Sequence, residues 1–123
     1  MSSANVLLLG WSYKPGIGDP RETPAEPLAE ALVEMGCNVQ TFDPLVDDRL
    51  FPSELATLVR SESEISPFDI AILVTAHDEV LEIDWGALAE KANHSLLYDG
   101  RRVLDVEELE SLGWSVYLLG API

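Results

Sequence analysis

The stretch VLLLGWSYKPGIGDPRETP, residues 6–24, decides the fold predicted for this chain. Its opening run VLLL is apolar on both faces, which is typical of a central strand in a parallel sheet, here expected over residues 5–9. The residues after the stretch have the apolar spacing of an amphipathic helix. Residues 10–24 are therefore predicted to form a loop from a strand to a helix, at the sheet edge where α/β proteins bind ligands.

This loop carries positive charge that is scarce elsewhere. The chain has 7 Lys and Arg against 22 Asp and Glu, and both Lys14 and Arg21 lie in the loop. Arg101 and Arg102 follow a later predicted strand, and the carboxyl ends of parallel strands meet at one edge of a sheet. Cations gathered at one edge of an acidic domain indicate a ligand with phosphate or carboxylate groups. The alternative left open is local ion pairing, with Asp19, Glu22 or Asp99.

Strand and helix patterns alternate along the rest of the chain. Further strands are expected over residues 38–42, 70–74, 96–99 and 115–119. Helices are expected over residues 52–59, over residues 85–91 behind an Asp84 cap, and from Asp105 to a stop at Gly113. This alternation predicts a three-layer, Rossmann-like α/β fold, with an open parallel sheet of about five strands in the order 2-1-3-4-5 and helices on both faces.

The helix after the loop has a start, an end and a buried stripe that can be predicted. A capping box over residues 23–26 favours a start there, whereas Pro27 favours a start one turn later. Gly36 is expected to end the helix. The buried stripe is expected at Leu28, Ala31, Leu32 and Met35.

The net charge of −15 excludes some partners and suggests an environment. Binding of nucleic acid needs clustered cations, so neither DNA nor RNA is expected. An excess of acid with only two lysines is typical of proteins from a high-salt cytoplasm, and this halophilic interpretation predicts that folding needs salt; an ordinary acidic protein is the alternative. No apolar run approaches the roughly 18 residues of a membrane span, and a cytoplasmic location is expected.

Several other polar residues are expected to have structural roles. The one cysteine, Cys37, excludes an internal disulfide and is expected to fill space rather than act as a nucleophile. His77 is expected to order its loop through a hydrogen bond, and His94 to be solvated. No metal-ligand spacing, G-x-G-x-x-G pattern or phosphate-binding P-loop is present. Thr75 stands where a phosphorylated receiver domain would need its acceptor aspartate, which argues against that signalling class.

Separated motifs along the chain resemble the C-terminal domain of the UDP-glucose/GDP-mannose dehydrogenase family. The resemblance runs from about residue 5 to residue 120. One domain is expected over residues 5–123, behind a disordered or non-native start at residues 1–4. The motifs are GWSYKP at residues 10–15 with DPRETP at 19–24, FDP at 42–44, VTAHDE at 74–79 and YDGRR at 98–102.

The resemblance implies the nucleotide-sugar-binding domain of an NAD-dependent dehydrogenase. Such enzymes oxidise the C6 hydroxymethyl group of a UDP- or GDP-sugar to a carboxylate, for polysaccharide biosynthesis, or oxidise an N-acetylhexosamine nucleotide. By motif, Tyr13, Lys14 and Arg101 would contact the nucleotide sugar, and Arg21 would help to bind NAD across a domain cleft. The NAD-binding domain and the central helical domain, which supplies the cysteine nucleophile, are absent from this sequence. No catalytic residue is therefore predicted, and the chain alone is expected to be inactive.

The resemblance also sets the expected partners. These are the nucleotide sugar, the remaining domains of the enzyme and, as an open alternative, further copies of the chain in a homo-oligomer. The segment between the strands at 38–42 and 70–74 is short, which predicts that an edge element of the family is missing. The alternative function is a stand-alone nucleotide-sugar-binding or interaction module without dehydrogenase activity. A G-x-G-x-x-G domain upstream in the native reading frame would distinguish the two.

Overall fold

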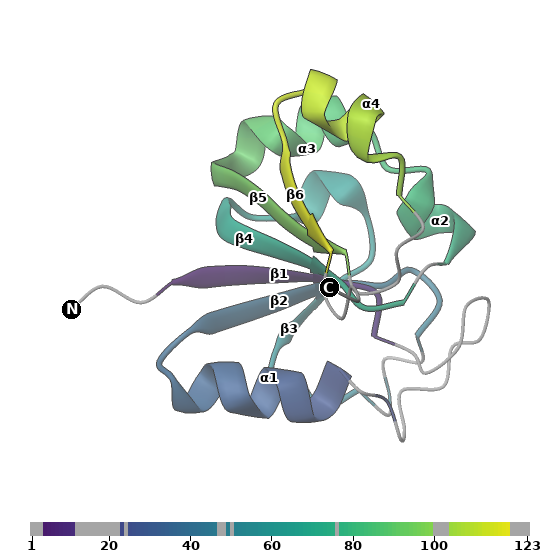
Figure 1. Cartoon of the computed structure of the whole chain (residues 1–123). Coiled ribbons are helices and arrows are strands. Elements are labelled where there is room, and N and C mark those ends of the chain that lie inside the picture. Colours follow the sequence, from purple (N-terminus) through teal and green to yellow (C-terminus); the bar gives the residue numbers. More distant parts are fainter. Residues whose placement is uncertain are drawn as a thin grey trace.

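A computed structural model of the chain describes residues 4–11, 23, 25–46, 49, 51–75, 77–99 and 104–118. Within these ranges the strands form one six-stranded parallel sheet with the order β3-β2-β1-β4-β5-β6 (Figure 1). The strands are β1 (Asn5–Leu9), β2 (Asn38–Phe42), β3 (Thr57–Val59), β4 (Phe68–Leu73), β5 (Ala92–Asp99) and β6 (Ser115–Leu118). The helices are α1 (Ala25–Glu34), α2 (Asp78–Leu81), α3 (Trp85–Lys91), α4 (Val106–Ser111) and the 3-10 turn η1 (Glu62–Glu64). The start predicted at residues 1–4 lies outside the described residues except for Ala4.

The sheet confirms the predicted fold class and has one more strand than expected. Its order agrees with the predicted 2-1-3-4-5 once the extra edge strand, β3, is set aside. The prediction of a helix over residues 52–59 is wrong, because residues 57–59 pair with Gln40–Phe42 of β2. This pairing buries the Val59 side chain and lets its carbonyl accept a hydrogen bond from the Asp43 amide at 3.1 Å. The segment expected to lack an edge element of the family does supply an edge strand, β3.

Side chains alternate between two cores along the central strand β1. Leu7 and Leu9 enter the core that packs beneath α2, α3 and α4, whereas Val6 and Leu8 enter the core that packs beneath α1. In Figure 1, α1 lies on one side of the sheet and α3 and α4 lie on the other. Helices cover both faces, as predicted, which explains why this strand is apolar throughout.

The helix α1 begins at the earlier of the two predicted starts, but the face that it buries differs from the predicted one. It begins at Ala25, so Pro27 lies in the first turn, where its missing N–H has no helical partner to lose. Gly36 ends the helix as predicted, with a φ of +87°. The predicted stripe is wrong at Ala31 and Met35, which are exposed, because the inward face is completed by Ala25 and Ala29 instead. The inward side chains are Ala25, Leu28, Ala29 and Leu32.

The helices α3 and α4 begin at the predicted aspartate caps. A side-chain oxygen of Asp84 accepts from the Ala87 amide at 3.1 Å, and one of Asp105 accepts from the Glu108 amide at 3.1 Å. Each bond satisfies a backbone donor that the first helical turn leaves unpaired. Gly113, with a φ of +102°, follows the end of α4, so both ends of that helix are confirmed.

Candidate functional site

Buried polar side chains gather where four strands end. The last residues of β1, β2, β4 and β5 lie in register, since Leu9 pairs with both Phe42 and Leu73, and Leu73 pairs with Asp99. Side chains at or just beyond these strand ends are at most 1% exposed: Asp43, Thr75, His77 and Asp99. Polar groups are costly to bury unless they are hydrogen-bonded, so each of these side chains needs a partner at this edge.

Asp43 is the centre of this polar group and has four hydrogen-bond partners among the described residues. One oxygen, Oδ2, accepts from the Trp11 amide at 2.8 Å and pairs with Nε2 of His77 at 3.0 Å. The other, Oδ1, accepts from the amides of Leu45 at 2.9 Å and Val46 at 3.1 Å. Three of these partners are backbone N–H groups, which can only donate. Because the pKa of Asp43 is lowered to about 2, Asp43 is an ionised carboxylate near neutral pH, and Nε2 of His77 is assigned as the protonated ring nitrogen.

The hydrogen bonds also set the pKa of Asp43. Burial by itself raises the pKa, but the hydrogen bonds from His77 and from the Trp11 and Leu45 amides, together with the charge attraction of His77, lower it from 3.8 to about 2. The folded state therefore favours the ionised form more than the unfolded chain does. Stability from this carboxylate is present above pH 4 and is lost as the pH falls towards 2.

We expect Asp43→Asn to remove this acid dependence. The difference in unfolding free energy between wild type and Asp43→Asn should shrink by about 2 kcal/mol between pH 5 and pH 2, because 1.36 kcal/mol corresponds to one pKa unit. Taking the difference cancels the titration of the other carboxylates, which both proteins share. Urea unfolding at each pH, at high salt, gives the two curves. A difference that stays constant across this range would contradict the ionised, hydrogen-bonded state.

The predicted ligand loop has a fixed base. The Gly10 amide donates to the Phe42 carbonyl at 2.8 Å, which ties the end of β1 to β2. The Thr23 hydroxyl donates to the Trp11 carbonyl and accepts from the Ala25 amide, the latter at 3.1 Å, at the start of α1. The described residues on either side of residues 12–22, Trp11 and Thr23, are therefore joined directly by a hydrogen bond.

A second segment is closed at the same edge. The Asp99 carboxylate, at the end of β5, accepts from the Leu104 amide at 3.1 Å and so joins the two ends of residues 100–103. Only β4 separates β5 from β1 in the sheet. The four predicted ligand residues, Tyr13, Lys14, Arg21 and Arg101, lie outside the described residues, and their roles stay predictions.

The remaining predictions for single side chains can be compared with the structure. The loop-ordering hydrogen bond of His77 is confirmed, and its partner is Asp43. His94 is exposed, as predicted, and Cys37 is partly buried beside the α1 core. The structural role of Asp43 was missed, although an aspartate directly after a strand and before a proline is the signal that could have found it. Among the described residues, no three His, Cys, Asp or Glu side chains form a group that could hold a metal.

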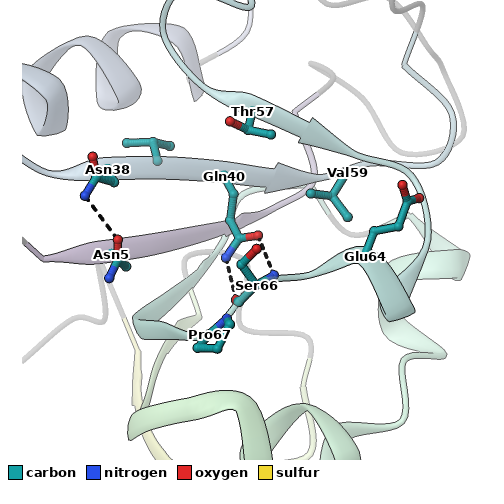
Figure 2. Close-up of a pocket in the computed structure, with 9 residues that line it drawn as sticks. Asn5, Asn38, Gln40, Thr57, Val59, Glu64, Ser66 and Pro67 are labelled. Atoms are coloured by element: carbon teal, nitrogen blue, oxygen red, sulfur yellow. Dashed lines mark hydrogen bonds between the residues drawn. The ribbon is translucent and has the colours of Figure 1, made fainter.

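A pocket lies at the opposite edge of the sheet, where the strands β1 and β2 begin, and its residues do not favour a ligand site there. Figure 2 shows it beside Asn5 and Asn38, which begin β1 and β2. The side-chain NH₂ group of Asn38 donates to the side-chain oxygen of Asn5 at 3.2 Å. Gln40 donates to the Ser66 carbonyl at 2.7 Å and accepts from the Ser66 amide at 3.0 Å. These groups bond one another, so they stabilise the sheet rather than await a ligand.

Comparison with known proteins identifies the family of this chain. Residues 7–106 match the UDP binding domain of the UDP-glucose/GDP-mannose dehydrogenase family. The chain is 28% identical to the UDP-glucose 6-dehydrogenase of Rickettsia bellii, over 100% of this chain and 29% of the relative. It is 29% identical to the UDP-N-acetyl-D-mannosamine dehydrogenase of Methanocaldococcus jannaschii, over 94% of this chain and 26% of the relative.

Solved structures agree with this match. The UDP-D-ManNAc dehydrogenase of Pyrococcus horikoshii superimposes with a TM-score of 0.76 at 25% identity, over 97% of this chain and 26% of that one. The NDP-N-acetyl-D-galactosaminuronic acid dehydrogenase of Methanosarcina mazei Go1 has the same fold, with a TM-score of 0.82 at 21% identity, over 96% of this chain and 25% of that one. The chain thus spans less than a third of the length of these relatives. It belongs to the UDP-glucose/GDP-mannose dehydrogenase family, whose UDP binding domain its residues 7–106 match.

Proposed function

We propose that this chain binds a UDP-sugar at the carboxyl-end edge of its sheet and is the substrate-binding part of an NAD-dependent nucleotide-sugar dehydrogenase. The complete enzyme would oxidise the C6 hydroxymethyl group of the sugar to a carboxylate. The observation that carries this proposal is that the described residues on either side of the segments bearing Lys14 and Arg101 are joined by hydrogen bonds at one edge of the sheet, between Thr23 and Trp11 and between Leu104 and Asp99. In the domain of a family named for UDP binding, such cations suit a pyrophosphate.

The residues of this chain do not fit a complete NAD site. In a dinucleotide-binding domain, an acidic residue at the end of the second strand bonds a ribose hydroxyl. Asp43 has that position, but its two oxygens accept four N–H groups of the protein itself. The sequence also lacks the glycine fingerprint for the pyrophosphate. NAD is therefore proposed to bind mainly to another domain, with Arg21 reaching it from this one, and no oxidation step is assigned to this chain.

We expect the 123-residue chain to bind UDP-glucose weakly, and Lys14→Ala and Arg101→Ala to reduce the affinity by at least about tenfold each. A hydrogen bond to a charged phosphate contributes about 1.5–3 kcal/mol, which corresponds to that factor. Titration calorimetry at high salt measures the affinity, with UDP-N-acetylmannosamine and GDP-mannose as competing ligands.

Lys91→Ala is the matched control, because Lys91 carries the same charge but lies beside the amino end of β5. Its Nζ donates to the carbonyls of Glu62 and Ile65, each at 2.9 Å. This variant should bind UDP-glucose like the wild type. Equal affinities in all four proteins would refute the assignment of Lys14 and Arg101 to the site.

Three further properties stay predictions, namely a cytoplasmic location, adaptation to high salt and assembly into oligomers. In the described ranges, no helix combines the length and apolar character needed to cross a membrane. Salt dependence is supported by two of the described cations, Arg60 and Lys91. Arg60 donates to the carbonyls of Val46 and Pro44 at 2.6 and 2.9 Å, and Lys91 also donates to two carbonyls, so none of these four bonds neutralises a carboxylate.

A further inference from the structure

We propose that Asp43 and His77 are a positioning pair for the UDP-sugar site: together they hold the base of the loop over residues 12–22 against the segment that follows β4. This inference rests on the proposed function, because the loop is taken to bind the ligand. Neither side chain is solvent-exposed, so the pair acts through the backbone that it holds and not by contact with the ligand.

The pair connects three strands at the ligand edge. Asp43 follows β2, holds the Trp11 amide two residues beyond β1, and holds the His77 ring four residues beyond β4. The bonds to Trp11 and His77 converge on the same oxygen, at 2.8 and 3.0 Å. If either Trp11 or His77 moves, the Oδ2 atom of Asp43 moves with it and the hydrogen bond to the other residue is disturbed.

Trp11 transmits this arrangement to the loop. Its amide is held by Asp43 while its carbonyl accepts from the Thr23 hydroxyl, so both peptide groups of the residue before the loop are fixed. Gly10 and Thr75, the residues beside this junction, are also tied to neighbouring strands by backbone bonds to Phe42 and Leu9, at 2.8 and 3.2 Å. The described residues that flank the loop, Trp11 and Thr23, are thus held in place by these bonds.

The chemistry of the pair predicts which substitutions will fail. All the hydrogen-bond partners of Asp43 given above are N–H groups, and asparagine has one oxygen and one NH₂ group in place of two oxygens. Turned towards Leu45 and Val46, the NH₂ of Asp43→Asn would face two backbone donors. Turned the other way, it would face the Trp11 amide, and His77 would accept from it only after moving its ring proton from Nε2 to Nδ1. Glutamine at position 77 can present a donor nitrogen to Asp43, whereas phenylalanine fills the space without a donor.

The test is UDP affinity measured by calorimetry on the folded 123-residue chain, with urea unfolding to establish that each variant is folded. We expect Asp43→Asn and His77→Phe to bind UDP about tenfold or more weakly, the size of effect that one displaced charged contact produces. His77→Gln should recover a large part of the affinity lost in His77→Phe. Wild-type affinity in a folded Asp43→Asn chain, or equal affinities in the two His77 variants, would overturn the proposal.

Asp69→Asn is the matched control, at the other end of the same strands. The Asp69 carboxylate accepts from the Asn5 amide at 2.7 Å and from the Asn93 side chain at 3.0 Å, at the amino ends of β1 and β5. This variant loses a hydrogen-bonded carboxylate next to β1 that is only partly buried, so stability should fall, by less than in Asp43→Asn, while UDP affinity stays unchanged. If Asp69→Asn lost as much UDP affinity as Asp43→Asn, the effect of Asp43 would be one of overall stability and not of positioning the loop.

Hydrogen exchange of the Trp11 amide tests the positioning role without requiring that UDP binds. Asp43→Asn and His77→Phe should expose this amide to exchange by local opening, whereas Asp69→Asn and His77→Gln should leave it protected. If the wild type does not bind UDP at all, the proposed function fails, and this protection pattern still decides whether the pair positions the loop. Unchanged protection in a folded Asp43→Asn chain would refute the positioning role. If Asp43→Asn does not fold, the two His77 variants supply the comparison.

Discussion

Gly10→Ala is expected to destabilise the chain by more than about 3 kcal/mol, because it combines backbone strain with a clash against backbone atoms. Gly10 has a φ of +90°, in the region that favours glycine. A Cβ atom there would lie 2.5 Å from the Thr75 carbonyl oxygen and 2.8 Å from the Thr75 nitrogen. Thr75 has little freedom to retreat, since its amide donates to the Leu9 carbonyl at 3.2 Å.

Gly36→Ala separates the two contributions. Gly36 has a similar φ of +87°, but no heavy atom lies within 4 Å of the position that its Cβ would take. Only the backbone strain remains, so the expected cost is about 1 kcal/mol. Urea unfolding of both variants gives the comparison. Equal destabilisation would mean that the close approach of β1 to the segment after β4 is not as tight as described.

The same junction matters for binding. Gly10 precedes Trp11, whose peptide groups hold the ligand loop. A shift of β1 away from Thr75 would move the Trp11 amide away from Asp43. Any folded fraction of Gly10→Ala should therefore bind UDP more weakly than the wild type, whereas Gly36→Ala, at the far end of α1, should not.

Sequence patterns predicted the elements whose signals are local. The apolar run at residues 5–9 and the aspartate caps at Asp84 and Asp105 each point to one structure, and all three were confirmed. The edge strand β3 was missed because Leu55, Leu58 and Val59 have a spacing that suits a helix equally well. Only pairing with β2, a contact between distant segments, makes that stretch a strand.

The site shows the same division between local and distant information. The motif around His77 was sufficient to predict a hydrogen bond that orders its loop. Its partner was not predictable, because Asp43 lies 34 residues away and no periodic pattern links the two positions. Likewise, the sequence places Lys14 and Arg101 after strands that share an edge, and the parallel register of β1, β4 and β5 supports that placement.

Trp11→Ala is expected to lower the unfolding free energy by about 3–5 kcal/mol, the usual cost of truncating a buried aromatic side chain. Trp11 belongs to the motif that the resemblance links to ligand binding, yet its ring is fully buried. It meets the Phe51 ring edge-on, with centroids 4.8 Å apart, and packs in the core beneath α1. An aromatic pair of this geometry adds stability beyond its buried area.

Trp11→Phe and Met35→Ala make this prediction specific. Phenylalanine keeps most of the buried ring and the same peptide groups, so Trp11→Phe should lose less stability than Trp11→Ala and retain UDP binding. Met35 is 73% exposed, and its truncation should change stability by less than about 0.5 kcal/mol. Urea unfolding and calorimetry on the three variants provide both measurements. If Trp11→Ala kept full stability but lost UDP binding, the ring would have to contact the ligand. Loss of stability in Trp11→Ala, with binding retained in Trp11→Phe, would instead place the contribution of this residue in the core and in the backbone that Asp43 holds.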